Sequence, residues 1–208
     1  LPMGLGLNFQ INERDYLIPM VVEEPSIIAA VSSAAKLIRR SGGFSSVAER
    51  PMLIGQIQVV NVPHAAHAKQ AVLQAKEEIL NLANSLHPNM VARGGGAHDV
   101  EVVTHGATAN HGEMLVVHLV VDTRDAMGAN LVNTMCEGAA PLVEKITGGE
   151  VFLRILSNLT DRALVRARAV IAPESLATGD RAGTEVRDSI ILANEFAEMD
   201  PYRATTHN

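Results

Sequence analysis

Alternating apolar and polar positions in the middle of the chain predict a sheet interleaved with helices. Residues 53–62 alternate with the period of a strand, and apolar residues recur at helical spacing from residue 67 to about residue 86. After a glycine-rich break, the same patterns predict two strands, a helix and a last strand over residues 100–105, 114–122, 127–146 and 151–157. This β-α-β-β-α-β order is typical of the ferredoxin-like arrangement, in which two helices cover one face of a four-stranded antiparallel sheet.

The N-terminal flank of this region predicts a short extended part followed by a helix. Residues 9–20 read as two extended segments around a polar turn. A helix opens at Pro25, since proline suits the first helical turn, and it ends at Ser41-Gly42-Gly43. Residues 45–51 are typical of a loop and mark a domain boundary.

The C-terminal flank decides the expected domain organisation. An alternating run at residues 165–171 could extend the central sheet or lead out of it, and a helix is predicted at residues 185–199. Neither flank alone is large enough to bury a core. We therefore expect residues 1–50 and 173–208 to form one domain, with residues 51–172 inserted into it. The predicted fold class is α+β, with a ferredoxin-like domain inserted in a mainly helical α/β domain.

The composition excludes several classes of protein. Hydrophobic residues make up 47% of the 208 residues and charged residues 19%, which allows a sizeable core and excludes wholesale disorder. A formal net charge of -6 argues against non-specific nucleic-acid binding. The single cysteine, Cys136, excludes a disulfide framework and fits a reducing compartment. Because every apolar run is shorter than a membrane span, we expect a cytoplasmic protein with no membrane or nucleic-acid partner.

Metal binding has little support in the sequence. His64 and His67 share a loop and could hold a metal ion, but solvated polar histidines are much more common. The zinc and phosphate-loop motifs with established spacing are absent from the sequence. The sequence therefore predicts no metal site.

A first candidate site lies where a predicted strand ends and a helix begins, at residues 122–130. Gly128 and its small neighbours Ala126 and Ala129 leave the backbone there uncovered. Free N–H groups and the positive end of a helix dipole make a phosphate site. The alternative is a structural one, in which Asp125 caps the helix and the small residues pack against the sheet.

A second candidate site is the pair Glu23 and Glu24, which stands directly before Pro25. Carboxylates ahead of a helix are favoured by its dipole, so a purely structural role is open. Two adjacent carboxyls in an apolar context could instead hold one proton near neutral pH, because desolvation raises a carboxyl pKa. Such a group can serve as a general acid.

Several segments of the chain together carry a resemblance to a known family. They are residues 8–12 (NFQIN), 21–26 (VVEEPS), 125–130 (DAMGAN), 132–135 (VNTM), 146–149 (ITGG), 154–159 (RILSNL) and 200–208 (DPYRATTHN). They resemble 3-hydroxy-3-methylglutaryl-coenzyme A (HMG-CoA) reductase, in the class typical of bacteria and archaea. The resemblance runs through nearly the whole chain, and its EEPS and DAMGAN segments are highly specific in combination.

The resemblance implies an oxidoreductase that interconverts HMG-CoA with mevalonate and coenzyme A. The reaction is a four-electron reduction of a thioester to an alcohol, or its reverse, and it uses two molecules of NADPH or NADH. The family's small domain is a ferredoxin-like cofactor domain inserted in a large substrate domain. Its active site is built across a homodimer, so a homodimer or a higher oligomer of dimers is expected here.

The resemblance also assigns roles to individual residues. Glu24 would be the catalytic acid that protonates the developing alcohol oxygen. Ser26 and Arg203 would bind the substrate, with Arg203 pairing the free carboxylate. The residues expected to contact the cofactor are Asp125, Ala126, Met127, Gly128, Ala129, Asn130 and Asn158.

Two departures from the family pattern matter. Members that prefer NADH carry an acidic residue at the position of His87, so its absence, with Arg93 nearby, favours NADPH over NADH. The family also continues past Thr206-His207-Asn208 into a catalytic lysine and later a catalytic aspartate and histidine. We therefore expect this chain by itself not to turn over, and a non-catalytic nucleotide-binding or assembly module is the alternative reading.

Overall fold

The computed structural model describes residues 1–207, which divide into two compact units. One unit combines residues 1–47 with the segment from residue 166 onward, and the other consists of residues 48–165. The two predicted domain boundaries lie after residues 50 and 172, close to these divisions. The chain is α+β, with two four-stranded sheets, one in each unit.

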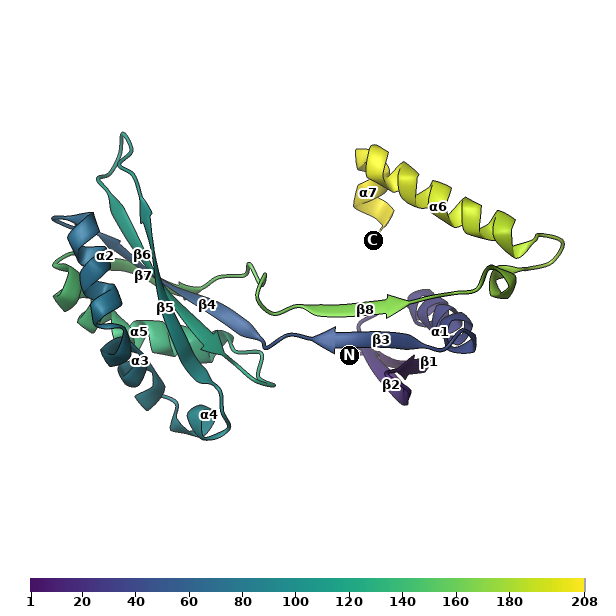
Figure 1. The fold of residues 1–208 in the computed structure, drawn as a ribbon, viewed down its shortest axis with the longest axis horizontal. Helices are drawn as coiled ribbons and strands as arrows, with labels where there is room; N and C mark the ends of the chain where they lie inside the picture. Colours follow the sequence, from purple (N-terminus) through teal and green to yellow (C-terminus); the bar gives the residue numbers. More distant parts are fainter. Residues whose placement is uncertain (208) are drawn as a thin grey trace. The chain divides into compact units, whose positions relative to one another are not determined.

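The first unit is built on a sheet with the strand order β2-β1-β3-β8 (Figure 1). β1 pairs antiparallel with β2 and parallel with β3. Phe9 and Phe44 stack across this junction, with ring centroids 5.9 Å apart. The elements are β1 (Met3–Ile11), β2 (Arg14–Val21), α1 (Pro25–Arg40), β3 (Phe44–Ala48), β8 (Val165–Ala169), the 3-10 helix η1 (Pro173–Leu176), α6 (Gly183–Met199) and α7 (Pro201–His207).

Two sequence predictions in this unit are corrected or decided by the sheet. The loop predicted at residues 45–51 is wrong, since β3 occupies most of it and pairs with β1 and β8. Its short sequence, without a regular alternation, is stabilised by long-range pairing, which local patterns do not report. The run at residues 165–171 leads out of the central sheet, because β8 joins the sheet of the first unit. The predicted helix opening at Pro25 is confirmed.

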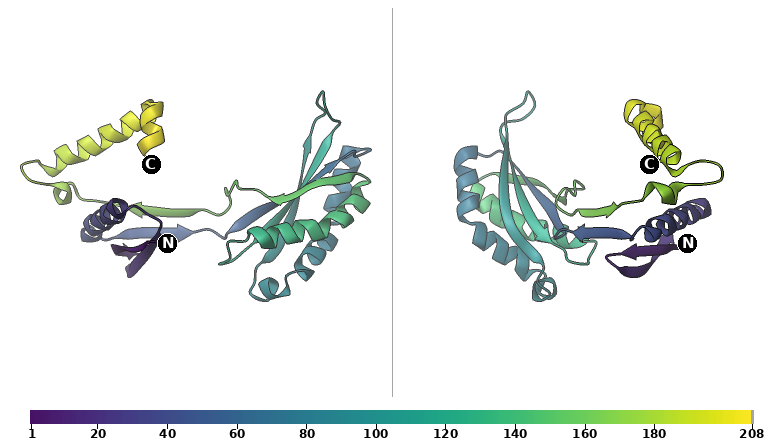
Figure 2. Two further views of the ribbon diagram at one scale, coloured as in Figure 1. Left: turned by 180° about the vertical axis from the view of Figure 1, so that it is seen from behind. Right: turned by 45° about the vertical axis from the view of Figure 1, so that its right-hand side comes forward.

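The second unit follows the predicted β-α-β-β-α-β order. Its sheet has the strand order β5-β6-β4-β7, and each neighbouring pair is antiparallel. The helices α2, α3 and α5 lie on one face of this sheet in both views of Figure 2. The elements are β4 (Met52–Val60), α2 (Ala65–Gln74), α3 (Lys76–Ser85), α4 (Pro88–Ala92), β5 (Gly96–His105), β6 (Met114–Asp122), α5 (Ala129–Thr147) and β7 (Glu150–Leu156).

The single helix predicted from residue 67 to residue 86 is instead two helices. α2 ends at Gln74 and α3 begins at Lys76, with Ala75 between them. The apolar stripe stays in phase across the break, because both helices bury their faces against the same sheet. Side-chain periodicity therefore does not reveal a one-residue interruption of the backbone.

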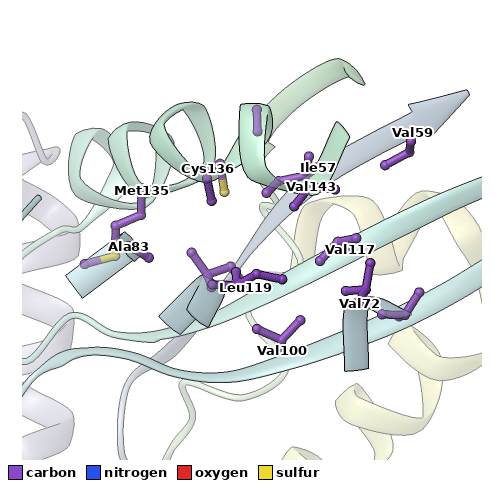
Figure 3. Close-up of a cluster of buried hydrophobic side chains, with 14 of the residues drawn as sticks. Ile57, Val59, Val72, Ala83, Val100, Val117, Leu119, Met135, Cys136 and Val143 are labelled. Carbon is purple, nitrogen blue, oxygen red and sulfur yellow. The ribbon is translucent and has the colours of Figure 1, made fainter. Parts of the chain in front are cut away.

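The core of the second unit lies between the sheet and its helices, as the side chains in Figure 3 show. Met135, Cys136 and Val143 of α5 face Ile57 and Leu119 of the sheet (Figure 3). All five side chains are fully buried. The core contains no aromatic residue and consists of branched aliphatic side chains, alanines, one methionine and the cysteine, so small-residue packing against the sheet sets the position of α5.

Cys136 is expected to be inert toward thiol reagents in the folded protein. Burial raises the pKa of its thiol to about 12, and the thiolate is the reactive form. At pH 8 we expect a thiolate fraction roughly a thousandfold below that of an ordinary cysteine. Reaction with a chromogenic disulfide should therefore need unfolding, and the denatured chain is the control. Rapid labelling of the folded chain would contradict the buried position.

Candidate cofactor and substrate sites

The sheet of the second unit brings several candidate segments to one edge. β6 and β7 both run antiparallel to β4, so their last residues lie beside its first residues: Asp122 pairs with Met52, and Leu156 pairs with Gly55. β5 begins at the same edge, because Gly96 also pairs with Asp122. The loops after β6 and β7 and the turn before β5 therefore leave the sheet at one place.

Backbone hydrogen bonds connect the two candidate cofactor loops to the start of β4. The amide of Thr123, at the end of β6, donates to Pro51 at 3.4 Å. On the other side, the amide of Met52 donates to the carbonyl of Arg162 at 3.1 Å, and the amide of Ser157 donates to Ile54 at 2.7 Å. The segments 123–130 and 157–162 are thus held on either side of one strand end.

Gly128 forms the N-cap of α5 and needs the conformation that only glycine adopts readily. Its φ is +90°, in the left-handed region, and a β-carbon there would lie 2.5 Å from Thr123 Cγ2 and 2.9 Å from Leu53 Cδ1. Within residues 1–207 no side chain caps this helix. The first-turn amides of α5 thus have no side-chain partner among these residues, an arrangement that suits a phosphate.

The structural alternative for this loop is wrong in its helix cap at Asp125, whereas the expected packing of a small residue against the sheet is found at Gly128, next to Leu53. α5 begins at Ala129, so Asp125 lies in the turn before the cap and is exposed. Met127 and Asn130 are also exposed, whereas Gly128 is buried. Ala126 closes the turn, with its amide donating to Thr123 at 3.0 Å. Small residues are needed here because the loop folds tightly onto β4 and leaves the helix start uncovered.

Asp122 and Arg124 shape the same loop, and sequence analysis placed both in the candidate segment 122–130 but gave neither a role. The Asp122 side chain is fully buried, and its Oδ1 accepts a hydrogen bond from the Arg124 amide at 2.9 Å. Its Oδ2 lies 3.3 Å from Arg50 Nε and 3.7 Å from Arg124 Nη1. Arg124 adopts a φ of +51°, so the buried carboxylate holds a strained turn and places a guanidinium at its surface.

The residues considered for cofactor specificity lie beside this loop. A β-carbon at Gly95 would lie 2.8 Å from Arg124 Cγ, so the turn that follows Arg93 packs directly against Arg124. Arg93 is exposed, and its Nε donates to the carbonyl of Asn89 at 3.2 Å. His87 caps α4, and its buried Nε2 has no hydrogen-bond partner within the described residues. Arg124 therefore packs against the glycine turn that Arg93 precedes.

The loop after β7 carries Asn158, which is exposed. The residue before this loop is fixed by Asn133 of α5, whose Oδ1 accepts a hydrogen bond from the Leu156 amide at 2.9 Å. Asn133 lies in the segment 132–135 that supported the family resemblance, but sequence analysis gave it no role. It ties the end of β7 to the first turns of the same helix that begins at Gly128.

Glu24 and Ser26 lie together in the first unit. Glu24 is the N-cap residue of α1, and its Oε1 accepts a hydrogen bond from Ser26 Oγ at 2.6 Å. The carboxylate of Glu23 accepts a hydrogen bond from the Glu24 amide at 3.2 Å. Both glutamates are exposed among the described residues, so this unit does not itself supply the burial that the sequence argument invoked.

Arg203 lies on α7 in the same unit. Its amide donates to Asp200 Oδ1 at 2.7 Å, which anchors the start of the helix. Its Nε is buried without a hydrogen-bond partner in the part of the chain that the structure describes. No hydrogen bond or ion pair among residues 1–207 joins Arg203 to Glu24 or Ser26. An unpaired guanidinium nitrogen of this kind fits an anionic partner.

Residues 1–207 contain neither a cluster of metal-binding side chains nor a membrane-spanning helix. No cluster of three or more histidine, cysteine, aspartate or glutamate side chains there could hold a metal ion. His64 and His67 form an edge-on ring contact with centroids 5.7 Å apart. Over the same residues, no helix combines the length and hydropathy needed to cross a bilayer.

Comparison with protein families decides which family this arrangement represents. The sequence model described as hydroxymethylglutaryl-coenzyme A reductase matches residues 1–208. The chain belongs to this family. The resemblance predicted from the EEPS and DAMGAN segments is thereby confirmed.

Curated HMG-CoA reductases match the chain over its full length. The 3-hydroxy-3-methylglutaryl-coenzyme A reductase of Archaeoglobus fulgidus is 49% identical over 208 residues, which cover 100% of this chain and 46% of that protein. A probable reductase of Borreliella burgdorferi is 28% identical, with coverage of 100% and 46%. The chain therefore spans about half the length of these relatives.

Solved structures agree with this assignment. A class II HMG-CoA reductase from Streptococcus pneumoniae, bound to NADPH in open conformations, matches with a TM-score of 0.89 and 40% identity, covering 100% of this chain and 50% of that one. A second structure of the reductase from the same organism gives a TM-score of 0.90, also at 40% identity, and is covered to 55%. The fold of the chain is thus that of class II HMG-CoA reductases.

Proposed function

We propose that residues 48–165 bind a nicotinamide dinucleotide at the edge of their sheet. The observation that carries this proposal is the uncapped start of α5 behind Gly128, where a β-carbon would clash with Thr123. The residues present fit the cofactor, since bare backbone amides suit a pyrophosphate. Asp125, Ala126, Met127, Gly128, Ala129 and Asn130 would line it, and Asn158 would lie near the nicotinamide or the reacting carbonyl.

We further propose that the unit is ferredoxin-like and prefers NADPH to NADH. The strand order β5-β6-β4-β7 with antiparallel neighbours supports the first point. Support for the second comes from Arg93 and Arg124 beside the glycine turn and from the unpartnered Nε2 of His87. No carboxylate stands at the position of His87 to repel a 2′-phosphate. The Streptococcus pneumoniae relative is itself described as bound to NADPH.

The activity that we propose is that of the family, the interconversion of HMG-CoA with mevalonate and coenzyme A. The dinucleotide supplies the hydride when it is bound. Hydride addition to a carbonyl creates an oxyanion, and the Glu24 carboxyl would hold the proton that neutralises it. Its hydrogen bond with Ser26 orients the carboxyl. Ser26 and Arg203 would hold the hydroxymethylglutaryl part, with the unpaired Arg203 Nε directed to its carboxylate.

The same proposal includes the oligomeric state and the cellular location of the protein. A homodimer would bring the substrate residues of one subunit to the cofactor residues of another, in a cytoplasmic protein without a bound metal. Because the family match covers the whole chain, the enzyme is favoured over a non-catalytic assembly module.

The binding part of this proposal can be tested with the chain as it stands. Calorimetric titration with NADPH and with NADH should give binding of both, with NADPH tighter by about three- to tenfold for one additional charge-assisted contact. Arg93→Met should remove most of that difference. Absence of binding of either dinucleotide at millimolar concentration would end the cofactor assignment, and tighter binding of NADH would reverse the specificity argument.

A further inference from the structure

Arg162, in the loop after β7, forms a paired contact with Glu101 on β5. Its Nη1 donates to Oε1 of Glu101 at 2.7 Å, and its Nη2 donates to Oε2 at 3.0 Å. β5 and β7 are the two opposite edges of the sheet. The Arg162 backbone lies beside the start of β4, where its carbonyl accepts a hydrogen bond from the Met52 amide, and its side chain reaches from there to the edge strand β5.

The contact lies on the face of the sheet that carries no helices. Glu101 pairs with His118, and His118 pairs with Gln56, so these side chains form one row across β5, β6 and β4. The neighbours of Glu101 on its strand, Val100 and Val102, are buried in the core on the helix side. Gln56 Nε2 lies 3.0 Å from His118 Nε2 in this row. Arg162 thus contacts the end of a row of polar side chains, and the register of the strands sets the positions of these side chains.

The chemistry of the pair is that of a specific contact rather than a chance approach of surface charges. Both nitrogens of the guanidinium end meet both oxygens of the carboxylate, the geometry in which an arginine–carboxylate pair is strongest. The hydrogen bonds that Arg162 donates to the Glu101 carboxylate lower the pKa of Glu101 and raise the pKa of Arg162. Both groups therefore remain charged throughout the neutral range.

The loop that Arg162 belongs to is the one that carries Asn158. Its backbone is held at one end by Ser157, which donates to Ile54, and at the other by the Arg162 carbonyl, which accepts from Met52. Between these anchors, Asn158, Leu159 and Thr160 are exposed. A short exposed segment has few buried contacts and therefore opens easily. A side-chain contact at one of its ends restricts the conformations that it adopts.

We propose that Arg162 and Glu101 are positioning residues for cofactor binding, which hold the loop 157–163 so that the Asn158 carboxamide meets the dinucleotide. This inference rests on the proposed function of the second unit. In this proposal neither Arg162 nor Glu101 contacts the cofactor. The ion pair lowers the conformational entropy that the loop loses on binding, so its removal weakens binding without removing a contact to the ligand.

The test is the affinity of the whole 208-residue chain for NADPH, measured by calorimetry. Arg162→Met should raise the dissociation constant about three- to fivefold, near the upper end of what an exposed ion pair can supply. Glu101→Gln should produce a similar rise. In the double variant the effect should equal that of one substitution, because both changes break one interaction.

Lys76→Met provides a matched control. Lys76 Nζ lies 2.5 Å from Asp99 Oδ1, so this variant also breaks an exposed ion pair to β5, but one that is made by α3 and not by the loop. It should leave the dissociation constant unchanged within twofold. Thermal unfolding of Lys76→Met and Arg162→Met should be similar, which separates positioning from a general loss of stability.

Hydrogen exchange supplies the second readout. The amides of residues 158–161 should exchange faster in Arg162→Met than in the unsubstituted chain and in Lys76→Met. A raised dissociation constant without faster exchange would overturn the inference, since Arg162 would then act on the ligand directly. Equal NADPH affinity in Arg162→Met and the unsubstituted chain would overturn it while leaving the proposed function intact. If the unsubstituted chain itself fails to bind, the proposed function fails and the inference falls with it.

Discussion

Replacing Gly128 with valine is expected to raise the dissociation constant for NADPH by more than about tenfold and to destabilise the second unit by about 1–3 kcal/mol. The loss of stability follows from the backbone, because a β-branched residue does not readily adopt a φ of +90°. It follows also from packing, since the new β-carbon would lie 2.5 Å from Thr123 Cγ2. The loss of affinity follows because the side chain covers the amides at the start of α5.

Gly112 provides the matched control for this substitution. It lies between β5 and β6, where a β-carbon would meet nothing within 4 Å and no left-handed φ is required. Gly112→Val should therefore change neither the melting temperature nor the affinity appreciably. Calorimetric titration well below the melting temperature, with folding checked by circular dichroism, separates the two effects of Gly128→Val. A Gly128→Val chain that binds NADPH like the unsubstituted chain would contradict the placement of the phosphates at this helix start.

Much of the second unit could be predicted from the sequence because its elements obey local periodicity. β4 alternates along much of its length, β6 is an apolar run interrupted by His118, and α5 presents one apolar stripe to the sheet. β3 in the first unit has no such signal. Its residues pair with β1 and with β8, which is more than a hundred residues away in the chain, and only these pairings make it a strand. The break at Ala75 was missed for a related reason, since it changes backbone angles and leaves the side-chain pattern unaltered.

The candidate cofactor site likewise contains residues that the sequence could identify and residues that it could not. Gly128 could be found because small residues at a strand–helix junction have a local physical meaning. Arg124, Asn133 and Arg162 could not, because each acts through a partner that only the folded sheet supplies: the Asp122 carboxylate, the Leu156 amide and the Glu101 carboxylate. The buried Asp122 is the clearest case, since an aspartate at the end of a strand is ordinary in sequence and becomes informative only when its burial and its two arginine neighbours are seen.

In a protein that carries the full length of its relatives, Glu24→Gln is expected to lower kcat by about 10²- to 10⁴-fold, the usual contribution of a general acid. Glutamine keeps the size of glutamate and can still accept the hydrogen bond from Ser26, so the change removes little except the proton. The affinity for NADPH should stay within about twofold, because the expected cofactor residues belong to the other unit. Steady-state kinetics with HMG-CoA, together with calorimetric titration, measure both quantities.

Glu23→Gln is the matched control for this prediction, since Glu23 is the adjacent carboxylate and is equally exposed among the described residues. Its carboxylate accepts a hydrogen bond from the Glu24 amide, an interaction that an amide oxygen can also accept, so kcat should fall by less than about tenfold. Both substitutions replace a carboxyl group with an amide at neighbouring positions, and a difference between them therefore reports proton transfer and not the local field at the start of α1. If Glu24→Gln keeps a near-normal kcat, or if Glu23→Gln is the slower variant, the assignment of the acid to Glu24 is wrong.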